Sequence, residues 1–114
     1  MTFQGPIPKV RKQGRIKPKY NATPKAHEKA YHVWLIENFV CFCECGAQAG
    51  CVHHPLTRHP EQRWRRDHEY VVPMADGCHK ALHLAGSEAA YAGHLDFAQG
   101  AAEYRRMGQR EGFL

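Results

Sequence analysis

The fold is decided by a stretch near the middle of the chain, where residues 70–86 read YVVPMADGCHKALHLAG. Two adjacent valines beside an aromatic residue predict a short strand over residues 70–73. Asp76 is a good N-cap for a helix over residues 77–85, and Gly86 is suited to end that helix. The stretch therefore predicts a strand followed at once by a helix, which places the chain in the α+β class.

Two pairs of histidines lie on predicted elements, in a chain with nine histidines among 114 residues. His79 and His83 lie one turn apart on the same face of the predicted helix, and two imidazoles on one face can bind one metal ion. His53 and His54 are adjacent on a second predicted strand, over residues 51–56, so their side chains point to opposite faces. One histidine of this doublet can therefore bind the ion while the other acts as a base.

The order of these elements resembles the ββα-metal (His-Me) finger of HNH nucleases. The first motif reads VHHP at residues 52–55, and the second reads VVPMADGCHKALH at residues 71–83. Within that superfamily the chain looks most like the small phage HNH proteins of the recombination-enhancement (Ref-like) type. Three further features carry this resemblance: Cys45-Gly46 before the His doublet, the Val-Pro step before the helix, and Gly86-Ser87-Glu88 after it. The resemblance covers about residues 25–100.

The resemblance implies a small ββα-metal core with flanking helices and a metal-dependent DNA endonuclease activity. It makes His54 the general base, which would polarise a water molecule for attack on a phosphodiester. It makes His53, His79 and His83 the ligands of one divalent ion, which is Mg, Mn, Ni or Zn. DNA would be bound through its phosphate backbone and cut with low sequence specificity, in phage recombination or DNA processing. The resemblance also allows a recombinase filament as a partner.

The sequence departs from the family pattern at Tyr70, which stands where HNH nucleases carry an asparagine that orients the base. Asp67, His68 and Glu69 are nearby candidates for this task. Asp67 is the preferred one, because a carboxylate can accept the Nδ1 proton of a base histidine. Asp67 is therefore expected to join His54 in the catalytic site.

The five cysteines are an odd number, and four of them lie within residues 41–51. Disulfide frameworks usually come with export and an even count, so reduced thiols are expected. The resemblance implies a structural zinc site, and its candidate ligands here are Cys43, Cys45 and Cys78. Cys43 or Cys41 could substitute for the missing knuckle cysteine by a shift in the turn, and Cys51 or a histidine could complete the set. Buried inert thiols are the alternative.

Positive charge is concentrated near the N-terminus. Seven of the 16 Lys and Arg residues lie in the first 25 positions, no acidic residue precedes Glu28, and the whole chain has a formal net charge of +5. Residues 1–22 contain three prolines and few large apolar residues, which predicts a flexible, disordered basic arm. Such an arm contacts DNA phosphates without reading sequence, or it is a solvated tail. The arm residues expected at DNA are Lys9, Arg11, Lys12, Arg15 and Lys17.

A second basic segment, residues 57–69, separates the two predicted strands. Arginine binds phosphate through two donors and also stacks on bases, so we expect this segment to contact the DNA backbone. Its arginines are Arg58, Arg63, Arg65 and Arg66. The alternative is a solvated loop with Trp64 folded onto the domain.

Helices are expected on both sides of the ββα core, which is predicted over residues 41–86. Thr23 is suited as the N-cap of a helix over residues 23–38. Its core face, by helical spacing, is predicted to be Ala26, Ala30, Val33, Trp34 and Phe39. Further helices are expected over residues 87–110, the last one capped by Asp96. Residues 23–114 would thus form one nuclease-like domain behind the arm.

Two other functions stay open at this point, a DNA-binding module that has lost the chemistry and a zinc-stabilised interaction protein. No apolar run is long enough to span a membrane, and no secretory signal is visible, so we expect a cytoplasmic protein in the bacterial host of a phage or mobile element. The remaining histidines are expected to be ordinary core or surface residues, namely His27, His32, His59, His68 and His94.

Overall fold

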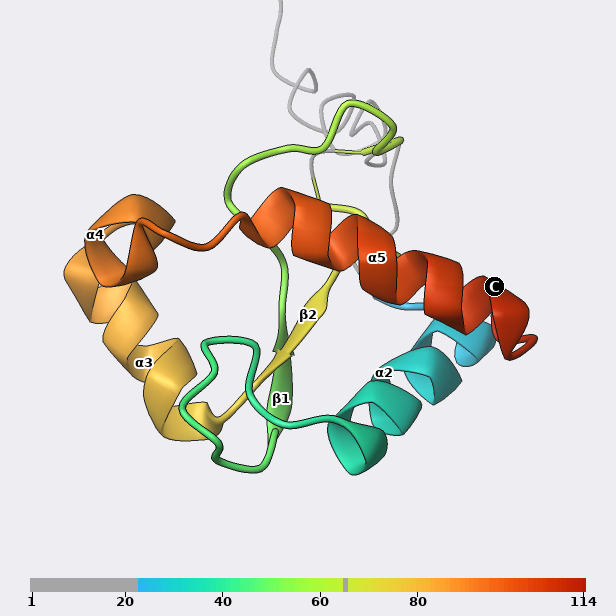
Figure 1. Ribbon diagram of the computed structural model, residues 1–114. Coiled ribbons are helices and arrows are strands. Elements are labelled where there is room, and N and C mark those ends of the chain that lie inside the picture. Colours follow the sequence, from blue (N-terminus) through green and yellow to red (C-terminus); the bar gives the residue numbers. More distant parts are fainter. Residues whose placement is uncertain (1–22, 65) are drawn as a thin grey trace, which may run out of the picture.

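The computed structural model describes residues 23–64 and 66–114, which form a small mixed unit of helices and a two-stranded antiparallel sheet (Figure 1). The predicted α+β class is confirmed. In chain order the elements are α2 (Ala26–Asn38), β1 (Cys51–His53), β2 (Val72–Met74), α3 (Asp76–Ala85), α4 (Glu88–Ala92) and α5 (Phe97–Arg110). The predicted basic arm, residues 1–22, and Arg65 lie outside the described residues. No helix within the described ranges is long and apolar enough to cross a membrane.

The strands β1 and β2 pair in antiparallel fashion, and β2 leads directly into α3. Cys51 lies opposite Met74, and His53 lies opposite Val72. Both strands are three residues long, so β1 is shorter than the predicted segment 51–56. A physical reason is Pro55, which has no backbone N–H to continue the ladder. In Figure 1 the strand pair lies between α2 on one side and α3 on the other, and α5 runs across them.

The sheet is fixed by apolar packing on both of its faces. Val71 and Val72 are fully buried, and as neighbours in extended chain they point to opposite faces. Val71 packs in one cluster with Tyr31 and Leu35 of α2, whereas Val72 packs in a second cluster that includes Leu82 of α3. The strand that precedes α3 is therefore held from both sides, which fixes the position of the helix as well.

Helix α2 begins at Ala26, so Thr23 is not its N-cap. The first turn is fixed by Glu28 instead, whose Oε1 accepts a hydrogen bond from the Lys25 backbone N–H at 2.7 Å. The carboxylate thus satisfies one of the amide groups that a helix start leaves without a partner.

The buried face of α2 also differs from the prediction, because Ala26, Ala30 and Val33 are exposed. Trp34 is partly buried and stacks on Tyr31 at 6.2 Å between ring centroids, in keeping with its predicted core role. The buried positions of the helix are Glu28, Tyr31, His32 and Leu35. Two of the four are polar, which hydrophobic periodicity does not reveal.

Two of the predicted capping residues, Gly86 and Asp96, cap the later helices as expected. Gly86 ends α3 in the left-handed conformation at φ 91°, which glycine adopts without strain. The Asp96 side chain accepts a hydrogen bond from the Gln99 backbone N–H at 3.0 Å and caps α5. The predicted N-cap of α3 is wrong, because Asp76 is the first residue of this helix and Ala75 is its N-cap.

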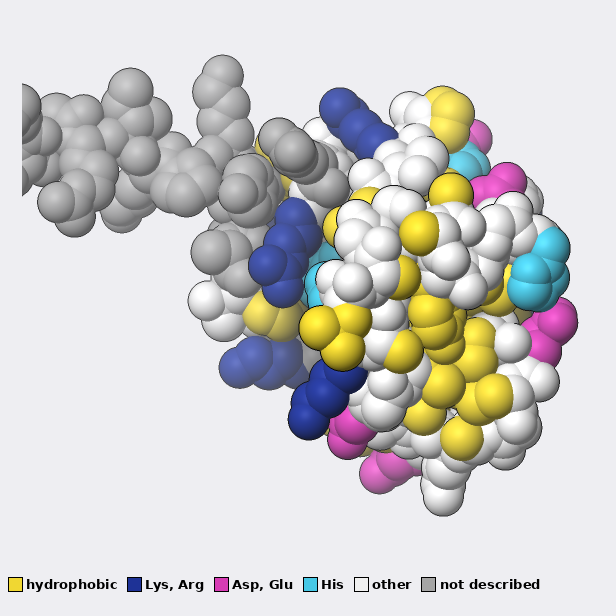
Figure 2. Space-filling view, turned by 90° about the vertical axis from the view of Figure 1, so that its left-hand side faces the viewer, with side chains coloured by type: hydrophobic (Ala, Val, Ile, Leu, Met, Phe, Trp, Pro, Cys, Tyr) yellow, Lys and Arg dark blue, Asp and Glu magenta, His cyan; other side chains and the backbone are white. Residues whose placement is uncertain are grey.

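The outer side of α3 and α4 carries exposed hydrophobic side chains. Figure 2 shows that hydrophobic groups occupy the middle of this face. Leu84 of α3 is 89% exposed.

Candidate functional site

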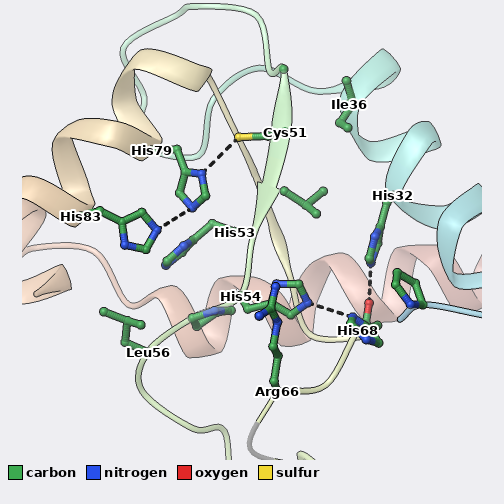
Figure 3. Close-up of a pocket in the computed structure, with 14 residues that line it drawn as sticks. His32, Ile36, Cys51, His53, His54, Leu56, Arg66, His68, His79 and His83 are labelled. Carbon is green, nitrogen blue, oxygen red and sulfur yellow. Dashed lines mark hydrogen bonds between the residues drawn. The ribbon is translucent and has the colours of Figure 1, made fainter. Parts of the chain in front are cut away.

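Six of the nine histidines line one cavity of about 910 Å³ (Figure 3). They come from α2, from β1 and the loop after it, and from α3, so segments far apart in the sequence meet here. The six are His32, His53, His54, His68, His79 and His83. Arg66 also lines the cavity and places a positive charge in its wall.

The structure brings together the three histidines predicted to bind metal. One ring nitrogen from each of His53, His79 and His83 lies within 4.8 Å of the other two. The Nε2 atoms of His79 and His83 are 3.0 Å apart. Nitrogens on one tetrahedral zinc ion would be about 3.4 Å apart, given Zn–N bonds of about 2.1 Å. The donor set therefore fits a single divalent ion.

Burial and a neighbouring thiol position two of the three rings, those of His53 and His79. His53 is 1% exposed at the end of β1. The Nδ1 atom of His79 lies 3.5 Å from the Cys51 thiol, which leaves Nε2 of His79 to face His83. Burial and the neighbouring imidazoles His53 and His83 lower the pKa of His79, and this favours the neutral ring that binds metal ions.

His54 follows β1 directly, and its side chain contacts a different set of residues. Its Nε2 lies 3.0 Å from Nδ1 of His68, while the His32 ring lies 6.2 Å away, edge to face. Burial, followed by the positive charge of Arg66, lowers the pKa of His54 to about 3. His54 is therefore a neutral imidazole at neutral pH, the form in which a histidine can accept a proton.

Asp67 lies away from His54, contrary to the role expected from the sequence. Its Oδ1 accepts a hydrogen bond from the Arg63 guanidinium at 3.0 Å and one from the Glu69 backbone N–H at 3.0 Å. Burial raises the pKa of Asp67, but these hydrogen bonds outweigh burial and hold the pKa below its ordinary value. The side chain that contacts His54 is instead His68, the next residue along the chain.

Tyr70, the residue at which the sequence departs from the HNH resemblance, belongs to the core. It is 2% exposed, stacks on His59 at 5.5 Å between ring centroids, and lies under the Arg105 guanidinium at 5.1 Å. It does not line the histidine cavity. Tyr70 therefore packs the loop that carries His68 and has no direct contact with His54 within the described residues.

A second cluster of possible metal ligands consists of four cysteines. Their sulfur atoms all lie within 4.8 Å of one another, and the four are Cys41, Cys43, Cys45 and Cys78. The Sγ atoms of Cys43 and Cys78 are 3.5 Å apart, and those of Cys45 and Cys78 are 3.6 Å apart. Sulfurs on one tetrahedral zinc ion would be about 3.8 Å apart, given Zn–S bonds of about 2.3 Å. This cluster could hold a zinc ion.

The loop before β1 has the shape that such a site needs. Glu44 and Gly46 adopt positive φ values of 69° and 82°, which turn the chain twice within a few residues. The Ala47 backbone N–H donates to the Cys45 sulfur at 3.4 Å. Burial raises the pKa of Cys43, but hydrogen bonds from Cys41, Tyr91 and Cys45 lower it to about 7. One thiolate is thus available near neutral pH to begin metal binding.

Cys41 completes the set that the sequence left at three. The alternation Cys41, Cys43, Cys45 was the only signal for it, and the hairpin-like turn is what directs the three sulfurs toward Cys78. Cys51, which with a histidine was expected to complete the set, lies at the histidine triad instead.

The arginines proposed to contact DNA differ in what they already bind. Arg66 is exposed and lines the cavity. Arg58 is exposed and donates to the Gln62 carbonyl at 2.9 Å. Arg63 is paired with Asp67 at 3.0 Å and Glu69 at 3.2 Å. In Figure 2, Lys and Arg side chains lie along one side of the described molecule.

Two cavity histidines, His32 and His68, were assigned from the sequence to ordinary core or surface positions. The His32 ring Nε2 lies 2.7 Å from the His68 backbone carbonyl, so α2 is tied to the loop that carries His68. Their sequence separation of 36 residues means that no local pattern could show the contact.

Comparisons with protein-family models, curated proteins and solved structures find no match to this chain.

Acidification should destabilise the protein through the cavity histidines. The pKa values of His32, His54 and His79 are all lowered, to about 3 for His54, by burial first of all. Between the unfolded pKa of 6.5 and these folded values, the unfolded chain binds protons that the folded chain does not, so the unfolding free energy falls as the pH falls. Each such proton changes this free energy by about 1.4 kcal/mol per pH unit.

The melting temperature should therefore decrease between pH 7.5 and 5.5, measured by circular dichroism without added metal. The melting temperature of His54→Ala should decrease less than that of the wild type, because this variant lacks one of the histidines that bind a proton on unfolding. Equal pH dependence in both proteins would contradict the lowered pKa of His54.

Proposed function

We propose that this chain is a metal-dependent endonuclease of the HNH type, which hydrolyses phosphodiester bonds in DNA with low sequence specificity. The observation that carries the proposal is the meeting of the triad His53, His79 and His83 with His54 in one cavity. The β1, β2, α3 order of the elements supports a ββα-metal core.

The roles of the residues follow from their chemistry. His53, His79 and His83 would hold a divalent ion, which when bound would neutralise negative charge on the phosphate and on the departing oxygen. His54 accepts the proton of the attacking water through the ring nitrogen that His68 does not contact. His68 orients the His54 ring. The contact with Asp67 that the sequence suggested is not needed for this assignment.

Substrate binding is assigned to arginines at and beyond the cavity. Arg66 lies at the cavity wall, where its guanidinium can pair with a phosphate. Such contacts hold the backbone without reading bases, in keeping with low sequence specificity. The basic segment of residues 1–22 adds further phosphate contacts, whose strength should fall with salt concentration.

The cysteine cluster is assigned a structural role, because all four ligand positions are thiols and no position is left for a substrate. The preferred ion of the histidine triad is a separate question, since imidazoles suit zinc or nickel, whereas magnesium and manganese prefer oxygen ligands. The Ref-like resemblance places the activity in phage recombination, with a recombinase filament as partner.

Two specific observations favour the other candidate functions. Tyr70 packs in the core and makes no contact with His54, which favours a DNA-binding module without chemistry. The cysteine cluster by itself would serve a zinc-stabilised interaction protein equally well. Neither alternative explains why the triad and His54 share a cavity with Arg66.

Relaxation of a supercoiled plasmid tests the proposal, with magnesium, manganese, nickel and zinc titrated separately. The wild type should nick the plasmid with at least one ion, and His83→Ala should reduce the rate on the order of 100-fold or more because it removes a ligand. The matched control is His94→Ala, which removes an exposed histidine outside the cavity.

The alternatives give different results in the same assay. A gel shift of the plasmid without relaxation by any ion would indicate the DNA-binding module. Absence of both the shift and the relaxation, with zinc still bound, would indicate the interaction protein.

A further inference from the structure

Glu88, the first residue of α4, is a buried carboxylate to which the proposed mechanism gives no role. It is 7% exposed. Its Oε2 lies 2.7 Å from Nε2 of His53 and also accepts a hydrogen bond from the Leu56 backbone N–H at 2.7 Å. One oxygen atom thus joins the end of β1 to the chain that follows His54.

The partners of Glu88 distinguish it from the other buried carboxylates. Asp67 is paired with Arg63 and Glu69 with Arg105, which compensates the cost of burying a negative charge. Glu88 has no Lys or Arg partner among the residues that the structure describes, and its side-chain partners there are an imidazole and an amide. A purely structural ion pair would not require a histidine from the candidate metal triad.

The geometry separates Glu88 from the ligands themselves. The donor atoms that lie within 4.8 Å of one another come from His53, His79 and His83, without Glu88. A carboxylate at the second ring nitrogen of a metal-binding histidine fixes the orientation and the tautomer of the ring. With Nε2–H donated to Glu88, the lone pair of His53 Nδ1 is free to face the ion.

We propose that Glu88 is a positioning residue of the candidate metal centre, which fixes the His53 tautomer through Nε2 and anchors the segment after His54 through Leu56. The inference rests on the proposed metal-binding function of the triad. Helix α4 supports the arrangement, because the Ser87 side chain accepts a hydrogen bond from the Ala90 backbone N–H at 3.0 Å and fixes the turn that carries Glu88.

The test is a calorimetric titration of nickel into protein that already carries one equivalent of zinc, so that the cysteine cluster is filled. Glu88→Gln has nearly the same shape as the wild type, and it should weaken nickel binding about 10- to 100-fold. Glu103→Gln removes the same charge from an exposed position of α5 and should bind nickel like the wild type.

A second readout separates positioning from general loss of structure. Two-bond ¹H–¹⁵N spectra of the metal-free ring should show the Nε2–H tautomer of His53 in the wild type and in Glu103→Gln. In Glu88→Gln this preference should be lost or weakened while the amide spectrum of the fold is retained. An unchanged tautomer in Glu88→Gln would overturn the proposal.

The outcomes also separate this inference from the function on which it rests. No nickel binding by the wild type beyond the zinc equivalent would refute the metal centre itself. If the wild type binds nickel and His79→Ala does not, then unchanged affinity in Glu88→Gln refutes only the role of Glu88. Complete loss of binding in Glu88→Gln, equal to that in His79→Ala, would make Glu88 a ligand and would equally overturn the positioning role.

Discussion

His54→Ala is expected to lower the rate of plasmid nicking by about 10²- to 10⁴-fold, which is the usual contribution of a general base. The His54 ring is neutral at neutral pH because burial and Arg66 lower its pKa, so it is ready to accept a proton from water. Bound phosphate would offset the charge of Arg66 and raise the basicity of the ring. The decrease in the nicking rate should therefore arise in the hydrolysis step and not in DNA binding.

The binding functions should survive this substitution. His54 is not part of the triad, so the nickel affinity of His54→Ala should equal that of the wild type, as should its salt-dependent gel shift with DNA. His94→Ala serves again as the control for removal of a histidine. Nicking by His54→Ala at the wild-type rate would remove His54 from the mechanism and direct attention to His68 or His32.

Loss of zinc from the cysteine cluster is expected to unfold the domain. Zinc bound by four thiolates contributes about 10–16 kcal/mol in small zinc domains, whereas a small domain is stable by about 5–15 kcal/mol in total. The cluster joins the loop before β1 to the first turn of α3. Zinc would add this link to the apolar packing that holds β2 and α3.

Cys78→Ser should therefore lower both the zinc content and the melting temperature, the first measured by atomic emission and the second by circular dichroism. The matched control is Cys51→Ser, because Cys51 lies outside the cluster and the zinc content should stay at one ion per chain. His83→Ala should also keep this zinc. A Cys78→Ser protein that is zinc-free yet melts at the wild-type temperature would show that the thiols are an inert part of the core.

Local features of the structure could be read from neighbouring residues in the sequence. The Val-Val pair, Asp96 and Gly86 act within a few residues of their own position, through strand propensity, capping and left-handed backbone. The placement of His79 and His83 on one face follows from the helical period alone. Where local signals failed, as for the start and the buried face of α2, two polar residues are buried in the first half of the helix.

Glu28 and His32 show why that face was not predicted. Each is buried because a polar partner satisfies it, the Lys25 backbone for Glu28 and the His68 carbonyl for His32. A hydrophobic pattern contains no information on such partners, since burial of a polar group depends on what lies opposite it. Ala30 and Val33 are apolar but face solvent because the partner elements pack on the other side.

The sequence by itself determined the order of two strands and a helix, the facing pair on that helix, and the residue types suited to bind metal. Only the tertiary structure decided that His68 contacts His54 while Asp67 pairs with Arg63, that Cys41 joins the other three thiols, and that Glu88 reaches His53. The physical reason is the distance along the chain over which each effect acts. Backbone conformation and side-chain periodicity act over a few residues, whereas these contacts depend on how separate elements pack against one another.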